Sequence, residues 1–113
     1  MKDDRLYLVH MLECALRIAE YTQAGRDEFL RDSKTQDAVV RNFEIIGEAA
    51  KRVTPATRSR LPQIPWRRIA GFRDVLILQY EGLDLQQVWV RIERDLPVLT
   101  DALAAAVGQG LLK

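Results

Sequence analysis

The segment Gly71–Tyr80, with the sequence GFRDVLILQY, places a few polar side chains in an otherwise apolar run. On a helix, Arg73 and Tyr80 share one stripe, whereas Asp74 and Leu78 share the neighbouring stripe. An arginine carries a permanent positive charge and a planar fork of donors that fits a phosphate group. Because an arginine buried without a polar partner is costly, this pattern favours an anion site or a seam between subunits. The alternative is a core helix that simply carries an arginine.

Basic residues accumulate before and within this segment. From Lys51 to Arg73 there are seven Lys or Arg residues and no Asp or Glu, although the whole chain has a net charge of only +1. Such a segment is typical of a phosphate-binding face. It is equally typical of a solvated face near the end of a helix. The seven residues are Lys51, Arg52, Arg58, Arg60, Arg67, Arg68 and Arg73.

The remaining residues that could do chemistry favour structural roles. His10 is the only histidine, and no Ser, Cys or Asp is spaced to form a nucleophile constellation with it, so we expect a surface or structural role. A single cysteine, Cys14, excludes an intrachain disulfide and a Cys-rich metal site, and we expect it in the core. Trp66 and Trp89 are interpreted as packing anchors. We expect no bound metal.

Helical spacing runs along the chain, and no segment alternates with the period of two that strands require. We expect a first helix, capped by Asp3 or Asp4, that runs to about Thr22. Ser33 and Gln36 form a capping box that opens a long amphipathic helix. The apolar positions of these two helices are expected to face the core; they are Leu8, Met11, Leu12, Ala15, Ile18 and Ala19, then Val39, Phe43, Ile46, Ala50 and Val53.

Further capping signals define the second half of the chain. Pro55 begins a short helix after Thr54, and residues 65–80 form the helix that carries the polar segment. Asp84 caps the last helix, which Pro97 should kink. Four main helices with short connections predict an all-α fold, an antiparallel up-and-down helical bundle. Its length of 113 residues is enough for a single domain, residues 1–113.

The composition is that of an ordinary globular protein. Hydrophobic residues make up 48% and charged residues 29% of the chain, which is too apolar for a disordered segment. No apolar run approaches the ~18 residues of a membrane span. The N-terminus carries two aspartates where a signal peptide would have a basic and then an apolar region. We therefore expect a cytoplasmic protein.

Three separated blocks, RNFEIIGEAAK, IPWRRIAGFRD and GLDLQQVW, closely resemble the HepT-like branch of the HEPN superfamily. The resemblance extends from Arg5 to about Leu99. It implies a helical HEPN domain that dimerises through its site helices and cleaves RNA without a metal in a cleft shared by two subunits. It also implies the toxin of a HEPN/MNT (type VII) toxin–antitoxin pair, whose partner is an MntA-type nucleotidyltransferase.

The site motif of this family is an arginine, usually followed by Asn or Asp, and then a His-x-Tyr element. Arg73, Asp74 and Tyr80 match it, and the resemblance implies that they hold the phosphate, orient the histidine and accept adenylate groups, respectively. ATP would be used by the partner, and no cofactor is expected on this chain. The RNA strand would be held by Lys51, Arg52, Arg67 and Arg68.

The histidine position of the motif holds Leu78. Histidine can accept or donate a proton near neutral pH, and leucine can do neither. Proton transfer is typically worth ~10²–10⁴ in rate, so ribonuclease activity is predicted to be impaired or absent. Leu78 is either a natural loss or a deliberate replacement, and both stay open. The alternative function is a non-catalytic helical dimer that serves as partner or substrate of the nucleotidyltransferase.

Overall fold

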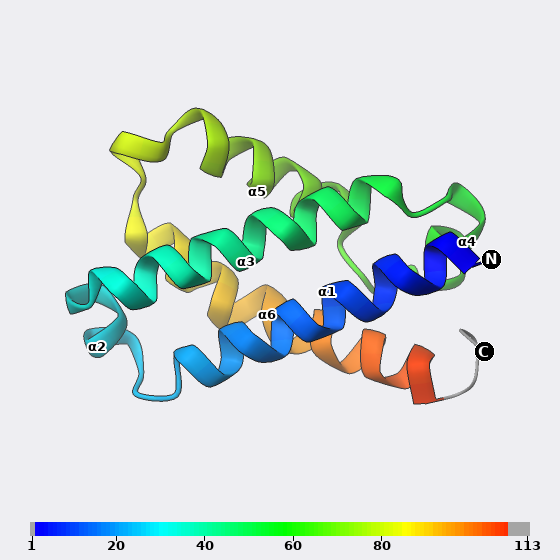
Figure 1. The fold of residues 1–113 in the computed structure, drawn as a ribbon, viewed down its shortest axis with the longest axis horizontal. Coiled ribbons are helices and arrows are strands. Elements are labelled where there is room, and N and C mark those ends of the chain that lie inside the picture. The colour runs from blue at the N-terminus through cyan, green and yellow to red at the C-terminus, as the bar shows by residue number, and fades with distance from the viewer. Residues whose placement is uncertain (1, 109–113) are drawn as a thin grey trace.

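The computed structural model describes residues 2–108, with the side chains of residues 4–79 and 81–108. Within that range the chain forms six α-helices and one 3₁₀ turn (Figure 1). The elements are α1 (Lys2–Tyr21), α2 (Arg26–Arg31), α3 (Ser33–Arg52), α4 (Pro55–Arg60), α5 (Trp66–Leu78), η1 (Tyr80–Gly82) and α6 (Leu85–Gly108). No described helix is long and apolar enough to span a bilayer.

The four long helices alternate in direction, as Figure 1 shows, so the prediction of an all-α antiparallel bundle is confirmed. Helix α1 packs against both α3 and α6, and α3 packs on its other side against α5. The short helices α2 and α4 lie at opposite ends of the bundle (Figure 1). Helix α3 therefore lies between α1 and α5 and is the element on which the candidate site is built.

The core follows the helical periodicity of the sequence. All five predicted apolar positions of the long second helix are buried, as is Cys14. Phe43 of α3 meets Phe72 of α5 edge to face, with the ring centroids 5.3 Å apart, which fixes the packing of these two helices. The predicted core position Ala19 is wrong, because its side chain is exposed, whereas the expected burial of Cys14 is confirmed.

Two predicted helix caps are corrected by the structure. Asp32, not Ser33, caps α3, because its side chain accepts a hydrogen bond from the backbone N of Lys34 at 3.1 Å. The side chain of Gln36 donates to the carbonyl oxygen of Phe29 at 2.9 Å and thereby ties α2 to α3. The predicted capping box is not formed. Asp32 and Ser33 are adjacent and both are favourable N-cap residues, but only one residue can occupy the N-cap position.

At the N-terminus, α1 already includes Lys2, so neither Asp3 nor Asp4 caps this helix, and Asp4 has another role. Its carboxylate is buried and instead binds Thr54 and Thr57 at the start of α4. The predicted cap Asp84 is confirmed, since its Oδ1 accepts from the backbone N of Gln86 at 3.0 Å.

Candidate active site on helices α3 and α5

Arg73 lies at a point where α5 passes close to α3. Its Cβ and Cγ pack on Gly47, whose lack of a side chain permits this approach, and 25% of the side chain is exposed. A glycine inside an otherwise regular helical pattern is a signal for close packing, and it marks Gly47 within the block EIIGEAAK. Sequence reasoning did not use that signal.

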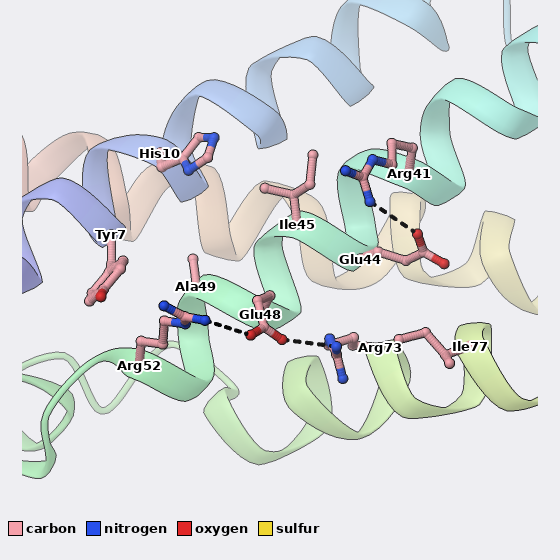
Figure 2. Close-up of a pocket in the computed structure, with 10 residues that line it drawn as sticks. All are labelled: Tyr7, His10, Arg41, Glu44, Ile45, Glu48, Ala49, Arg52, Arg73 and Ile77. Carbon is pink, nitrogen blue, oxygen red and sulfur yellow. Dashed lines mark hydrogen bonds and ion pairs between the residues drawn. The ribbon is translucent and has the colours of Figure 1, made fainter.

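The guanidinium group of Arg73 has partners within the chain. Its Nη2 lies 2.9 Å from the Glu48 carboxylate, and its Nη1 lies 3.3 Å from that of Asp74. Arg73 therefore has polar partners within its own chain, which the sequence pattern did not indicate. Glu48 also binds Arg52, at 3.3 Å, so that one carboxylate joins two arginines from different helices (Figure 2).

Asp74 forms a second bridge between α5 and α3. The Nζ of Lys51 donates to its carboxylate at 2.6 Å. This hydrogen bond, assisted by the nearby charges of Lys51 and Arg73, holds the pKa of the Asp74 carboxyl below its usual value. Lys51, Arg52, Arg73 and Asp74 therefore lie together, and sequence reasoning had named all four.

Leu78 is not among the residues that line the groove beside Arg73. Its side chain is 82% exposed, and it lies on the same outward face of α5 as Asp74 and the partly exposed Val75. Arg73 and Ile77 instead face the groove beside α3, as the predicted division into two stripes requires. The side chain of Tyr80 lies outside the described part of the chain; its backbone begins the turn η1, so the predicted helix over 65–80 ends two residues early.

A shallow groove of about 320 Å³ runs across α3 between α1 and α5 (Figure 2). Its charged and aromatic lining residues are Tyr7, His10, Arg41, Glu44, Glu48, Arg52 and Arg73. His10 is exposed, as expected, but sequence reasoning missed that it shares a groove with Arg73. The two residues are 63 positions apart in sequence, and only the packing of α1 on α3 brings them to one surface.

A second, wider groove of about 730 Å³ is lined by Asp74 and by three basic residues, Lys51, Arg58 and Arg67. Arg68 does not line this groove. Its guanidinium group binds the buried carboxylate of Asp95 at 3.0 Å and joins α5 to α6. The same carboxylate also accepts from Arg91 at 3.1 Å. In this structure Arg67 thus lines the basic groove, whereas Arg68 forms an ion pair between α5 and α6.

The sequence of this helical bundle matches a known protein family. Residues 11–106 match the model of the HepT-like family, described as ribonuclease HepT-like. The chain belongs to the HepT-like ribonuclease family. Its motif helix is α5, and the residues that pair with the motif come from α3.

Individual HepT-like relatives agree with this membership. A probable ribonuclease HepT from Thermococcus cleftensis is 42% identical over 94 residues, which cover 82% of this chain and 86% of the relative. A protein of Methanocaldococcus jannaschii, whose name combines a gamma-glutamylcyclotransferase with an inferred RNase, is 41% identical over 103 residues; the match covers 90% of this chain and 46% of that protein. This chain thus corresponds to less than half of that relative. No solved structure matches the chain.

HepT-like membership implies RNA as the substrate. Among residues 2–108, no group of three or more His, Cys, Asp or Glu residues is placed to hold a metal ion. The candidate site comprises Arg73, the carboxylates that bind it, and the basic and aromatic side chains of the two flanking grooves.

Proposed function

We propose that this chain is the ribonuclease toxin of a HEPN/MNT (type VII) toxin–antitoxin pair, acting on RNA in the cytoplasm without a metal ion. The observation that carries the proposal is the placement of Arg73 in a groove on α3 beside a second, basic groove. A phosphate bound there would contact the permanently charged guanidinium group of Arg73. The basic residues of the second groove would attract the rest of the RNA strand.

Cleavage at such a site has three requirements. A base must remove the proton of the 2′-hydroxyl group, an acid must protonate the leaving oxygen, and positive charge must stabilise the crowded phosphate. Arg73 supplies the charge, and Asp74, one helical turn before position 78, is placed to orient an imidazole there. Leu78 supplies no proton transfer, so we propose that activity in this chain is impaired or absent.

A homodimer would complete the proposed site. Position 78 faces outward from α5 and away from the groove that holds Arg73 of the same chain. A second copy packed on this outward face would bring the two motif helices together and form one cleft from both. The exposed apolar side chains of Leu78 and Val75 support such a seam. A closed two-fold dimer is also the commonest assembly of soluble proteins.

We further propose that an MntA-type nucleotidyltransferase neutralises the toxin by transferring adenylate from ATP to Tyr80. The backbone of Tyr80 begins a 3₁₀ turn directly after α5, so the residue lies at the end of the motif helix. Each added phosphate group would place negative charge close to the site and repel an RNA backbone.

RNA cleavage in the presence of a chelator tests the ribonuclease proposal. The Leu78→His variant should cut RNA, whereas the unaltered chain should cut it slowly or not at all. Because the side chain at position 78 is 82% exposed, the substitution should leave the fold intact. Absence of cleavage by a folded, dimeric Leu78→His variant would contradict the proposal.

The second candidate function is a non-catalytic helical dimer that binds the nucleotidyltransferase as partner or substrate. The observation that favours it is the leucine at the histidine position. Expression of the Leu78→His variant without the partner separates the two functions. Growth arrest would support the toxin, and normal growth together with tight binding to the nucleotidyltransferase would support the partner role.

A further inference from the structure

Glu48 places its carboxylate between two arginines that come from different helices. Its Oε2 lies 2.9 Å from Nη2 of Arg73 on α5, and its Oε1 lies 3.3 Å from Nη2 of Arg52 on α3 (Figure 2). The two guanidinium groups therefore converge on a position the size of one small anion. In the described structure that position is filled by the chain's own carboxylate.

A carboxylate and a phosphodiester group present similar binding features to an arginine. Each carries one negative charge over two oxygens, and each fits the planar fork of a guanidinium group. The side chain of Glu48 is 43% exposed, so its ion pairs are screened by water and individually weak, typically about 0.2–1 kcal/mol. A phosphate that reaches both arginines can therefore exchange with Glu48 at little free-energy cost.

We propose that Arg52 and Arg73 together form a binding site for one phosphodiester group of an RNA strand, and that Glu48 occupies this site until the strand arrives. The inference deepens the proposed ribonuclease function and rests on it. Arg52 then binds the same phosphate group as Arg73. Glu48 competes with the RNA for the two arginines and does not itself bind the RNA.

The charges around the site support an exchange of this kind. Three cations, Lys51, Arg52 and Arg73, surround two carboxylates, Glu48 and Asp74, which gives a local charge of +1. When Glu48 swings outward, Arg52 and the Nη2 of Arg73 lose this carboxylate, while Asp74 stays bound to Lys51 at 2.6 Å and to the Nη1 of Arg73 at 3.3 Å. The phosphate then takes the place of one carboxylate, and the local charge balance is preserved.

Glu44 provides a matched control in the same groove. It lies one turn before Glu48 on α3, and its carboxylate is 3.8 Å from Arg41. Replacing either glutamate by glutamine removes one negative charge from the groove. Only the change at Glu48 also removes the ion pairs with Arg52 and with the Nη2 of Arg73, so a difference between the variants reports on the phosphate site and not on general attraction.

The test measures the affinity of the full chain for a fluorescent single-stranded RNA oligonucleotide by anisotropy, without divalent ions and at low salt. We expect Glu48→Gln to tighten binding about three- to tenfold, as expected for the loss of two competing surface ion pairs. Glu44→Gln should change the affinity by less than about twofold. Adding Arg73→Ala to Glu48→Gln should abolish the gain. Thermal unfolding followed by circular dichroism checks that each variant is folded.

The outcomes separate the two proposals. If the unaltered chain binds RNA and loses affinity with Arg73→Ala, but Glu48→Gln binds no more tightly than Glu44→Gln, the Glu48 inference is overturned and the ribonuclease proposal stands. If neither the unaltered chain nor Glu48→Gln binds RNA, both proposals fail. If ATP competes with RNA at equal affinity for the Glu48→Gln variant, the site belongs to a free nucleotide, and the assignment to an RNA strand is overturned.

Discussion

Arg73 packs directly onto Gly47, so closely that a methyl group at position 47 would lie 2.4 Å from the Cβ and 3.1 Å from the Cγ of the arginine. This contact sets the separation of α5 from α3 at the site. It also directs the guanidinium group toward Glu48, the residue that follows Gly47 in the chain. The geometry of the candidate site thus depends on the absence of a side chain at position 47.

We expect Gly47→Ala to destabilise the protein by about 1–3 kcal/mol, because the added methyl group overpacks the α3–α5 contact and displaces Arg73. Chemical denaturation measures the loss. Gly71→Ala is the matched control: Gly71 lies within α5, an added methyl group there would meet nothing within 4 Å, and we expect a gain of up to about 1 kcal/mol. Equal stability of Gly47→Ala and the unaltered chain would contradict this account of the contact.

The ribonuclease activity expected of Leu78→His should depend on Arg73. In the double variant Leu78→His with Arg73→Ala, cleavage should fall by about 10²-fold or more, because the phosphate then lacks its stabilising charge. Leu78→Ala should leave RNA uncut, since it supplies no group that transfers protons. Chelator-resistant cleavage of a labelled RNA measures all three. Unaltered cleavage in the double variant would show that Arg73 is not part of the site.

We expect a homodimer that uses the outward face of α5. Leu78→Lys should shift the chain toward the monomer, because it places a charge in an apolar seam. Leu6→Lys is the control: Leu6 is also well exposed, at 64%, but lies on α1. Light scattering at micromolar concentration gives the mass of each variant. A monomer mass for the unaltered chain would contradict the dimer, and dissociation by Leu6→Lys alone would place the interface elsewhere.

Adenylylation by the cognate nucleotidyltransferase should depend on Tyr80. We expect intact-mass analysis after incubation with the enzyme and ATP to show one or more added adenylates on the unaltered chain and none on Tyr80→Phe. Tyr21→Phe, which changes an exposed tyrosine at the end of α1, should be labelled normally. Equal labelling of Tyr80→Phe would place the modification on another residue.

Asp4 should make stability depend on acid pH. Burial by itself raises the pKa of this carboxyl, but hydrogen bonds from Thr54 and Thr57 outweigh it, and the pKa lies below the ordinary value of 3.8. A lowered carboxylate pKa contributes stability that is present above pH 3.8 and is lost as the pH falls through the folded-state pKa. We therefore expect Asp4→Asn to cost about 1–2 kcal/mol at pH 7. The difference should shrink below pH 3.8 in thermal unfolding, and a constant difference would contradict this role.

The sequence determined much of this protein by itself. The helices, their order and most of their buried faces follow from the spacing of apolar residues, because a repeat of three to four positions is a local property of the chain. The position of Arg73, Asp74 and Leu78 on two stripes of one helix follows in the same way. The family was evident from separated blocks of sequence, and the comparisons confirm it.

The tertiary structure alone decided what these residues meet. Glu48 as the partner of Arg73, Asp95 as the partner of Arg68, and the groove shared with His10 all depend on how helices rotate and how closely they pack. Helical periodicity indicates which face of a helix is buried but not which residue of another helix lies opposite. Interhelical ion pairs form over a few ångströms, so a small change in the separation of α3 and α5 would exchange one partner for another. For that reason these pairings could be read only from the packed structure.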